Sequence, residues 1–185
     1  LQELKEKEVE GLILDLRNNS GGLVSSGIAV ADSLLSEKPV VETKNRNGIK
    51  DAIISQKETS FDGPMVTLVN KGTASASEIL AGSLQDNERS ILMGEKTYGK
   101  GLIQSLKSLG DDSGIAITVA SYLTPKGNNI QGQGMTPDKF LDLPDASEYG
   151  SADDKWVRNA ELFLESILEK KEVLPLQTNE QSNEG

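Results

Sequence analysis

The stretch Gly11–Leu35, GLILDLRNNSGGLVSSGIAVADSLL, predicts a strand, a glycine-containing loop and a helix in direct succession. Its first six residues are a short apolar run bounded by polar residues, which is typical of a buried strand. The Asn-Asn-Ser-Gly-Gly segment that follows is rich in residues that tolerate a positive φ angle. Apolar residues then recur with helical spacing at Val24, Ile28, Ala31 and Leu35. This succession indicates an α/β fold.

A second unit of the same type lies in the middle of the chain. An apolar run at Pro64–Asn70 predicts a buried strand, and a helix is expected from about Ser75 to Asn87. The second half is richer in strands, with a β-branched run at Gly114–Leu123. Further strands are expected at residues 40–44, 49–56, 90–93, 102–106 and 140–143. Strand–loop–helix units followed by a β-rich half favour the α/β class.

The C-terminal part predicts one long helix and a polar tail. Apolar residues recur on one face of a helix expected over residues 151–171, with Ser151 and Asp154 as its capping box. We expect residues 1–173 to form one domain and residues 174–185 to be a frayed tail.

Composition excludes several classes of protein. The chain has 185 residues, of which 36% are hydrophobic and 26% charged, so it is too apolar for a disordered protein. Its formal charge of −10 repels nucleic-acid phosphates and anionic lipids, which makes both poor partners. It contains no apolar run near the roughly 18 residues of a membrane span.

The chain contains neither histidine nor cysteine. This excludes a Ser-His-Asp triad, a cysteine nucleophile and zinc sites built on those ligands. Any acid–base chemistry must therefore use Lys, Tyr, Asp or Glu.

The glycine loop Asn18–Gly22 could bind an anion, because backbone N–H groups at the start of a helix attract negative charge. It could equally be an ordinary connection between strand and helix. Its spacing does not match the G-x-G-x-x-G pattern of dinucleotide-binding proteins.

The start of the second expected helix also has two interpretations. Ser75 and Glu78 form the S-x-x-E pattern of a capping box. A serine at a helix N-terminus could instead be a nucleophile, because the helix dipole and free N–H groups favour an oxyanion there. Ser75 and Ser77 both compete for that role.

The loop Gly94–Gly101, GEKTYGKG, matches seven of the eight positions of a P-loop. The hydroxyl that would hold Mg²⁺ is replaced by Gly101, and a strand pattern follows where a P-loop needs a helix. We therefore reject a nucleotide-binding role. Lys100 is either a solvated side chain or a general base, and a base must be uncharged, which requires removal from water. Leu102, Ile103 and the strand 64–70 are the apolar groups expected to exclude that water.

Four sequence blocks occur in order at Leu14–Gly22, Val69–Glu78, Gly94–Gly101 with Gln104, and Asn129–Asp138. Together they closely resemble the carboxyl-terminal processing proteases, also called tail-specific proteases, over about residues 11–143. The residues in these blocks are similar in particular to those of the cyanobacterial and chloroplast branch of the family. That branch trims a photosystem II reaction-centre precursor.

The resemblance implies a serine–lysine mechanism that proceeds through an acyl-enzyme. Ser75 matches the family's nucleophile, Lys100 its general base and Gln104 the residue that orients the lysine. The spacing of 25 residues from serine to lysine is that of the family. If Lys100 and Gln104 lie on one strand, their separation places both side chains on one face.

The resemblance also implies an oxyanion hole, a fold and the absence of a cofactor. The backbone N–H groups of Gly22 and Ala76 match the oxyanion donors, with Gly21 as the neighbouring possibility. The family's core is an α/β fold akin to the crotonase and Clp protease folds. Its mechanism needs no metal or organic cofactor.

The family's other features set expectations for the whole protein. A regulatory PDZ domain that binds the substrate's C-terminal tail is expected upstream of Gly11, and the compartment is expected to be the periplasm or the thylakoid lumen. Ser20 stands where many relatives carry Pro or Gly, which leaves the two glycines after it intact. A catalytically silent binding or scaffold module with the same fold is the alternative function.

Overall fold

The computed structural model describes residues 2–142, except 49 and 57, and residues 149–173. The expected tail, residues 174–185, and the last residue of the expected final strand, Leu143, lie outside the described residues. The elements in chain order are α1 (Gln2–Glu6), β1 (Leu12–Asp15), α2 (Val24–Leu34), β2 (Pro39–Asn45), β3 (Lys50–Ile54), β4 (Met65–Val69), α3 (Ala76–Asp86), β5 (Ile91–Gly94), β6 (Leu102–Ser108), β7 (Gly114–Leu123), β8 (Lys139–Phe140) and α4 (Lys155–Val173).

The first sheet is parallel and runs in the order β1-β4-β5-β8. Its central strand β4, MVTLV, is buried at every residue, as expected of an apolar strand with both faces of its sheet covered. Side chains alternate across it. Met65 and Val69 join the core on one face, whereas Val66 and Leu68 join the core on the other.

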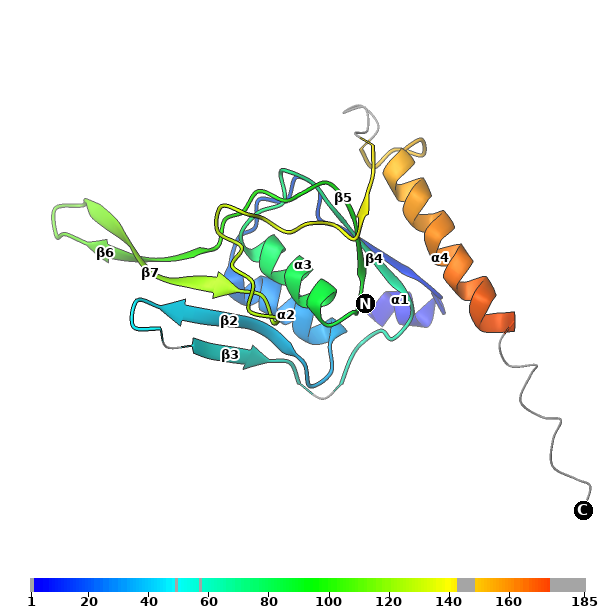
Figure 1. Ribbon diagram of the computed structural model, residues 1–185, viewed down its shortest axis with the longest axis horizontal. Coiled ribbons are helices and arrows are strands. Elements are labelled where there is room, and N and C mark those ends of the chain that lie inside the picture. The colour runs from blue at the N-terminus through cyan, green and yellow to red at the C-terminus, as the bar shows by residue number, and fades with distance from the viewer. Residues whose placement is uncertain (1, 49, 57, 143–148, 174–185) are drawn as a thin grey trace, which may run out of the picture.

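Helices cover both faces of this parallel sheet (Figure 1). On one face α2 and α3 pack together, with Ala31, Leu34 and Leu84 in the core. On the other face α4 buries Trp156, Ala160 and Leu164. Every residue of α3 from Ala76 to Leu84 is buried, because that helix lies between its sheet, α2 and the second sheet.

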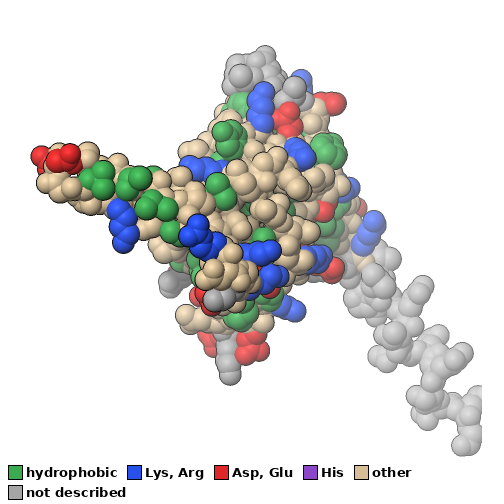
Figure 2. Space-filling model, turned by 60° about the vertical axis from the view of Figure 1, so that its left-hand side comes forward, with side chains coloured by type: hydrophobic (Ala, Val, Ile, Leu, Met, Phe, Trp, Pro, Cys, Tyr) green, Lys and Arg blue, Asp and Glu red, His purple; other side chains and the backbone are tan. Residues whose placement is uncertain are grey.

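The second sheet is antiparallel and runs in the order β3-β2-β7-β6. It packs on α3 through Val41, Ile79 and Tyr122. The hairpin of β6 and β7, which we call the arm (residues 102–123), projects from the body of the molecule (Figure 1). Most of its residues are exposed, and Figure 2 shows apolar side chains along it.

The architecture confirms the expected α/β class, with two strand–loop–helix units and a β-rich second half. The cap of the C-terminal helix differs from expectation. That helix begins at Lys155, and the carboxylate of Asp154 accepts hydrogen bonds from the N–H groups of Trp156 and Val157. Asp154 is therefore the N-cap, and the capping box predicted for Ser151 is wrong because residues 151–153 precede the helix as a turn and bends.

Candidate active site

Ser75 lies immediately before α3 with φ 56° and ψ −121°. A non-glycine residue rarely adopts a positive φ, and such strain is concentrated at functional sites. Ser75 is partly exposed, whereas Ser77 is buried and 5% exposed. The local sequence pattern left these two serines in competition and the family resemblance selected Ser75; the exposure of Ser75 also favours it as the nucleophile.

The carboxylate of Glu78 joins the serine segment to the lysine segment. One oxygen, Oε2, accepts hydrogen bonds from the backbone N–H groups of Ser75 at 3.0 Å and Lys100 at 2.8 Å. The other oxygen, Oε1, accepts from the N–H of Gly99 at 2.7 Å and from the hydroxyl of Thr97. Glu78 is fully buried, and these four donors satisfy both oxygens of its side chain.

Sequence reasoning found only part of the role of Glu78. The S-x-x-E spacing predicted its bond to the N–H of Ser75, which the structure contains. It could not reveal the bonds to residues 97–100, because those residues are about twenty positions away and meet Glu78 only in the folded chain.

The glycine loop after β1 lies directly against the serine. Gly21 has φ 92°, and a Cβ atom there would lie 2.9 Å from Cβ of Ser75 and 2.9 Å from N of Ala76. Only glycine permits this approach. The N–H of Gly21 donates to the side-chain oxygen of Asn19 at 3.0 Å. It is therefore occupied, which favours Gly22 over Gly21 as an oxyanion donor.

Ala76, the other expected oxyanion donor, is the first residue of α3. The N–H groups in the first turn of a helix have no acceptor within that helix. The N–H of Ala76 is thus available next to Ser75, at the positive end of the helix dipole.

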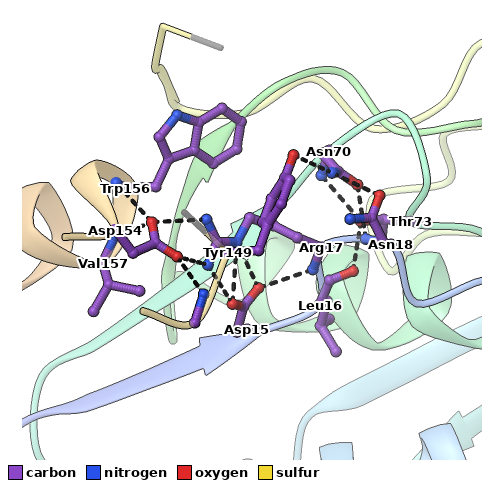
Figure 3. Close-up of polar contacts among 11 residues, drawn as sticks. Asp15, Leu16, Arg17, Asn18, Asn70, Thr73, Tyr149, Asp154, Trp156 and Val157 are labelled. Carbon is purple, nitrogen blue, oxygen red and sulfur yellow. Dashed lines mark hydrogen bonds and ion pairs between the residues drawn. The ribbon is translucent and has the colours of Figure 1, made fainter. Parts of the chain in front are cut away.

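Amide side chains hold the glycine loop in place (Figure 3). The side-chain oxygen of Asn70 accepts from the N–H groups of Asn18 and Gly72, both at 2.9 Å, and its NH₂ group donates to the side chain of Asn18 at 3.0 Å. The hydroxyl of Thr73 donates to the carbonyl of Leu16 at 2.7 Å. These bonds join the loops that follow β1 and β4.

An ion-pair network, in which Arg17 and Asp154 are buried and Asp15 is exposed, ties the same loop to the start of α4. The guanidinium of Arg17 pairs with Asp15 and with Asp154, which is 137 residues away (Figure 3). It also lies 4.8 Å from the ring centroid of Tyr149 and 5.6 Å from that of Trp156, within the range of a cation–π interaction. Arg17 directly precedes the glycine loop, so this network anchors the loop to the helix.

The pKa values in this network show how strongly the charges interact. Burial by itself would raise the pKa of Asp154, but hydrogen bonds from Arg17 and from backbone N–H groups hold it well below its ordinary value. Burial by itself would lower the pKa of Arg17, but its bonds to Asp15 and Asp154 raise it above the ordinary value. Both groups are therefore charged over the physiological range.

Lys100 and Gln104 line one pocket of about 450 Å³ together with Leu102. The two residues do not lie on one strand as expected, because β6 begins only at Leu102 and a β-bulge lies between Ile103 and Gln104. They line the same pocket nevertheless. Bulges are frequent next to active sites, where they redirect a side chain. Ala74, the residue before Ser75, lines the same pocket.

Lys100 is exposed in this structure. The apolar surroundings expected for it are therefore wrong in part. Leu102 lines its pocket but is 38% exposed, and the buried strand β4 does not line it. Among the residues that the structure describes, no hydrogen bond joins the side chains of Ser75, Lys100 and Gln104.

The loop Gly94–Gly101 leads into strand β6 rather than a helix, which confirms that it is not a P-loop. A second, smaller pocket of about 220 Å³ lies on the α2 side of Ser75, and Gly22, Ala76 and Leu80 contribute to its wall. The two pockets flank the serine.

Comparisons with known proteins found a matching family and similar proteins. The model of one protein family, described as peptidase family S41, matches residues 1–140. The chain is 53% identical over 144 residues to a carboxyl-terminal-processing protease of Synechocystis sp., covering 78% of the chain and 34% of that protein. It is 49% identical over 142 residues to the chloroplastic C-terminal processing peptidase of Tetradesmus obliquus, covering 76% of the chain and 30% of that protein.

A solved structure, named photosystem II D1 C-terminal processing protease, has the same fold with a TM-score of 0.72. It is 47% identical in sequence, and the match covers 76% of this chain and 36% of that one. The chain thus spans about a third of the length of the curated relatives it matches.

Proposed function

The chain belongs to peptidase family S41, and on that premise we propose that it is the catalytic core of a serine endopeptidase that cleaves protein substrates near their C-termini. One observation carries the proposal: a single oxygen of the buried Glu78 binds the backbone N–H groups of both Ser75 and Lys100. A nucleophile and a base need a fixed relative position, because small misplacements cost large factors in rate.

Lys100 removes the proton from the hydroxyl of Ser75, and the serine oxygen attacks the substrate's carbonyl carbon. The N–H groups of Gly22 and Ala76 bind the resulting oxyanion; loss of one such donor typically costs about 10²–10³ in kcat. When the C–N bond breaks, Lys100 gives its proton to the leaving amine. Lys100 then takes a proton from the attacking water and returns it to the serine as the acyl group leaves.

This cycle requires an uncharged Lys100, and Gln104 orients it by accepting a hydrogen bond from its amine. In the substrate-free protein Lys100 is exposed. A peptide that fills the pocket excludes water from Lys100, Leu102 and Gln104, which disfavours the charged amine. Substrate binding is therefore what prepares the base.

We extend the proposal to the substrate, partners and compartment of the whole protein. The match to the photosystem II D1 C-terminal processing protease supports a reaction-centre precursor as substrate in a phototroph, and the cyanobacterial and chloroplastic relatives support the periplasm or the thylakoid lumen. A PDZ domain upstream of Gly11 binds the substrate's tail. No helix among the described residues is long and apolar enough to cross a membrane.

An acylating or phosphonylating active-site probe tests the proposal. We expect the probe to label Ser75, Ser75→Ala to abolish both labelling and peptide cleavage, and Ser77→Ala to retain them. Lys100→Arg should be inactive, because a guanidinium does not give up its proton. A protein that takes up no probe and cleaves no peptide is the scaffold module instead, and normal turnover by Lys100→Arg contradicts the serine–lysine mechanism.

A further inference from the structure

Gln131 lies in the loop before β8 and lines the pocket that holds Lys100 and Gln104. Its side-chain oxygen accepts a hydrogen bond from the N–H of Gly101 at 2.9 Å. Only the oxygen of an amide can accept, so this bond fixes the orientation of the side chain and assigns the other position to the NH₂ group. That NH₂ group has no partner among the described residues, although it carries two donors.

The loop of Gln131 is fixed against the loop of Lys100 at several points. The N–H of Gly132 donates to the carbonyl of Gly99 at 2.9 Å, and the N–H of Met135 donates to the hydroxyl of Thr97 at 2.7 Å. Gly134 has φ 64°, and a Cβ atom there would lie 2.3 Å from the carbonyl oxygen of Thr97. Gln131 is thus presented by a backbone that is held in place beside the base.

The proposed role of Lys100 determines which part of the substrate binds in the pocket that Lys100 and Gln131 line. The group that takes the serine proton later gives it to the leaving amine, so the leaving peptide must lie beside Lys100. The acyl part lies on the other side, toward the oxyanion donors Gly22 and Ala76. The pocket of Lys100 and Gln131 therefore takes the residues that follow the scissile bond.

We propose that Gln131 is a substrate-binding residue for the leaving segment, and that its NH₂ group donates a hydrogen bond to the carbonyl oxygen of the residue directly after the scissile bond. This inference rests on the proposed peptidase function. The group that Gln131 recognises is a carbonyl oxygen, which belongs either to a continuing peptide or to a terminal carboxylate. In a peptidase that recognises the C-terminal tails of proteins, this contact helps to align the scissile bond with the serine.

Partitioning of the acyl-enzyme measures this contact separately from acylation. A peptide ester acylates the protein, and added amines then compete with water for the acyl group. Alaninamide carries the carbonyl that Gln131 would bind, free alanine carries a carboxylate instead, and isopropylamine replaces the carboxamide with a methyl group. The readout is the ratio of capture by alaninamide to capture by isopropylamine.

Gln131→Glu keeps an oxygen for the N–H of Gly101 but loses the donor. We expect it to lower the capture ratio about tenfold, the effect of one neutral hydrogen bond, and Gln131→Met to do the same. Gln133→Glu, an exposed position outside the pocket, should leave the ratio unchanged. Higher capture of alanine than of alaninamide by the unaltered protein identifies a terminal carboxylate as the preferred ligand.

Two results overturn the inference, and they are distinguishable from a failure of the proposed function. An unchanged ratio in Gln131→Glu beside a reduced ratio in Gln131→Met assigns Gln131 a scaffold role only. An unchanged ratio in both variants excludes any contact. If instead the unaltered protein forms no acyl-enzyme with the ester, the peptidase function itself is wrong and the inference falls with it.

Discussion

The serine and the lysine come from two regions that differ sharply in burial. Ser75 immediately precedes α3, a helix buried from Ala76 to Leu84 between two sheets, whereas Lys100 lies just before the exposed arm. The proposed nucleophile, Ser75, is thus positioned by a core, and the proposed base, Lys100, by a few hydrogen bonds to that core through Glu78. Because Lys100 is exposed at a pocket, a substrate peptide can bind beside it and cover it.

Removal of either proposed catalytic side chain should have the largest effect on activity, with different consequences for stability. Ser75→Gly and Lys100→Ala should each lower kcat by about 10⁴-fold or more. Ser75→Gly relieves a positive φ and should raise the free energy of unfolding by about 1 kcal/mol. Lys100→Ala should leave that free energy unchanged, because the side chain is exposed. Peptide cleavage and urea denaturation measure the two quantities.

If Lys100→Ala unfolded as easily as a core variant, the contrast between the two regions would be wrong. Equal stability of Ser75→Gly and the unaltered protein would show that the strain at Ser75 is small.

The buried pair of Arg17 and Asp154 should govern acid stability. The folded-state pKa of Asp154 is well below its unfolded value of about 3.9, so its contribution is present above that value and is lost as the pH falls below it. Asp154→Asn removes one of the two carboxylates that pair with the buried Arg17 and leaves Asp15 as the other, so it should cost about 1–3 kcal/mol at neutral pH. Denaturation curves between neutral pH and pH 3 should show a weaker acid dependence in the variant.

Asp153→Asn is the matched control, because Asp153 is adjacent and exposed. An acid dependence that Asp154→Asn leaves unchanged would assign the loss of stability at low pH to other carboxylates.

Glu78 is expected to act as a positioning residue between the two regions. A glutamine there offers one oxygen instead of two, so two of the four donors lose their acceptor. We expect Glu78→Gln to lower kcat about 10²-fold with little change in KM. Steady-state kinetics well below the unfolding temperature measure kcat and KM separately.

The exposed Glu88 provides the control for that experiment, and Glu88→Gln should behave as the unaltered protein. A rise in KM without a fall in kcat would mean that Glu78 shapes the substrate pocket rather than aligning Ser75 with Lys100.

The same substitution in the two sheets should have unequal effects on stability. Val66 in β4 is fully buried, whereas Val119 in β7 is 45% exposed. Val66→Ala should cost about 2 kcal/mol, and Val119→Ala should stay within about 0.5 kcal/mol. Thermal or urea unfolding checks the difference, and similar costs at both sites would show that another part of the protein covers the arm.

The sequence by itself determined the elements and the chemistry they could carry. Apolar runs such as Gly11–Leu16 and Pro64–Asn70 predicted β1 and β4 as buried strands. This is right for β4, which is buried at every residue, but β1 is only half-buried because it lies at the edge of the sheet. The absence of histidine and cysteine restricted the base to few residue types. The resemblance then selected Ser75 and Lys100, which no periodicity could have done.

Only the tertiary structure decided what surrounds these residues. The hydrogen bonds that the carboxylate of Glu78 accepts from residues 97–100 and the ion pair across 137 residues depend on contacts between distant segments. A local sequence pattern does not encode such contacts. The same applies to Lys100: its neighbours along the chain, Leu102 and Ile103, suggested an apolar site, but Lys100 is exposed and only Leu102 of these two lines its pocket. Side-chain burial is a property of packing between distant segments, and the sequence around one residue specifies only part of it.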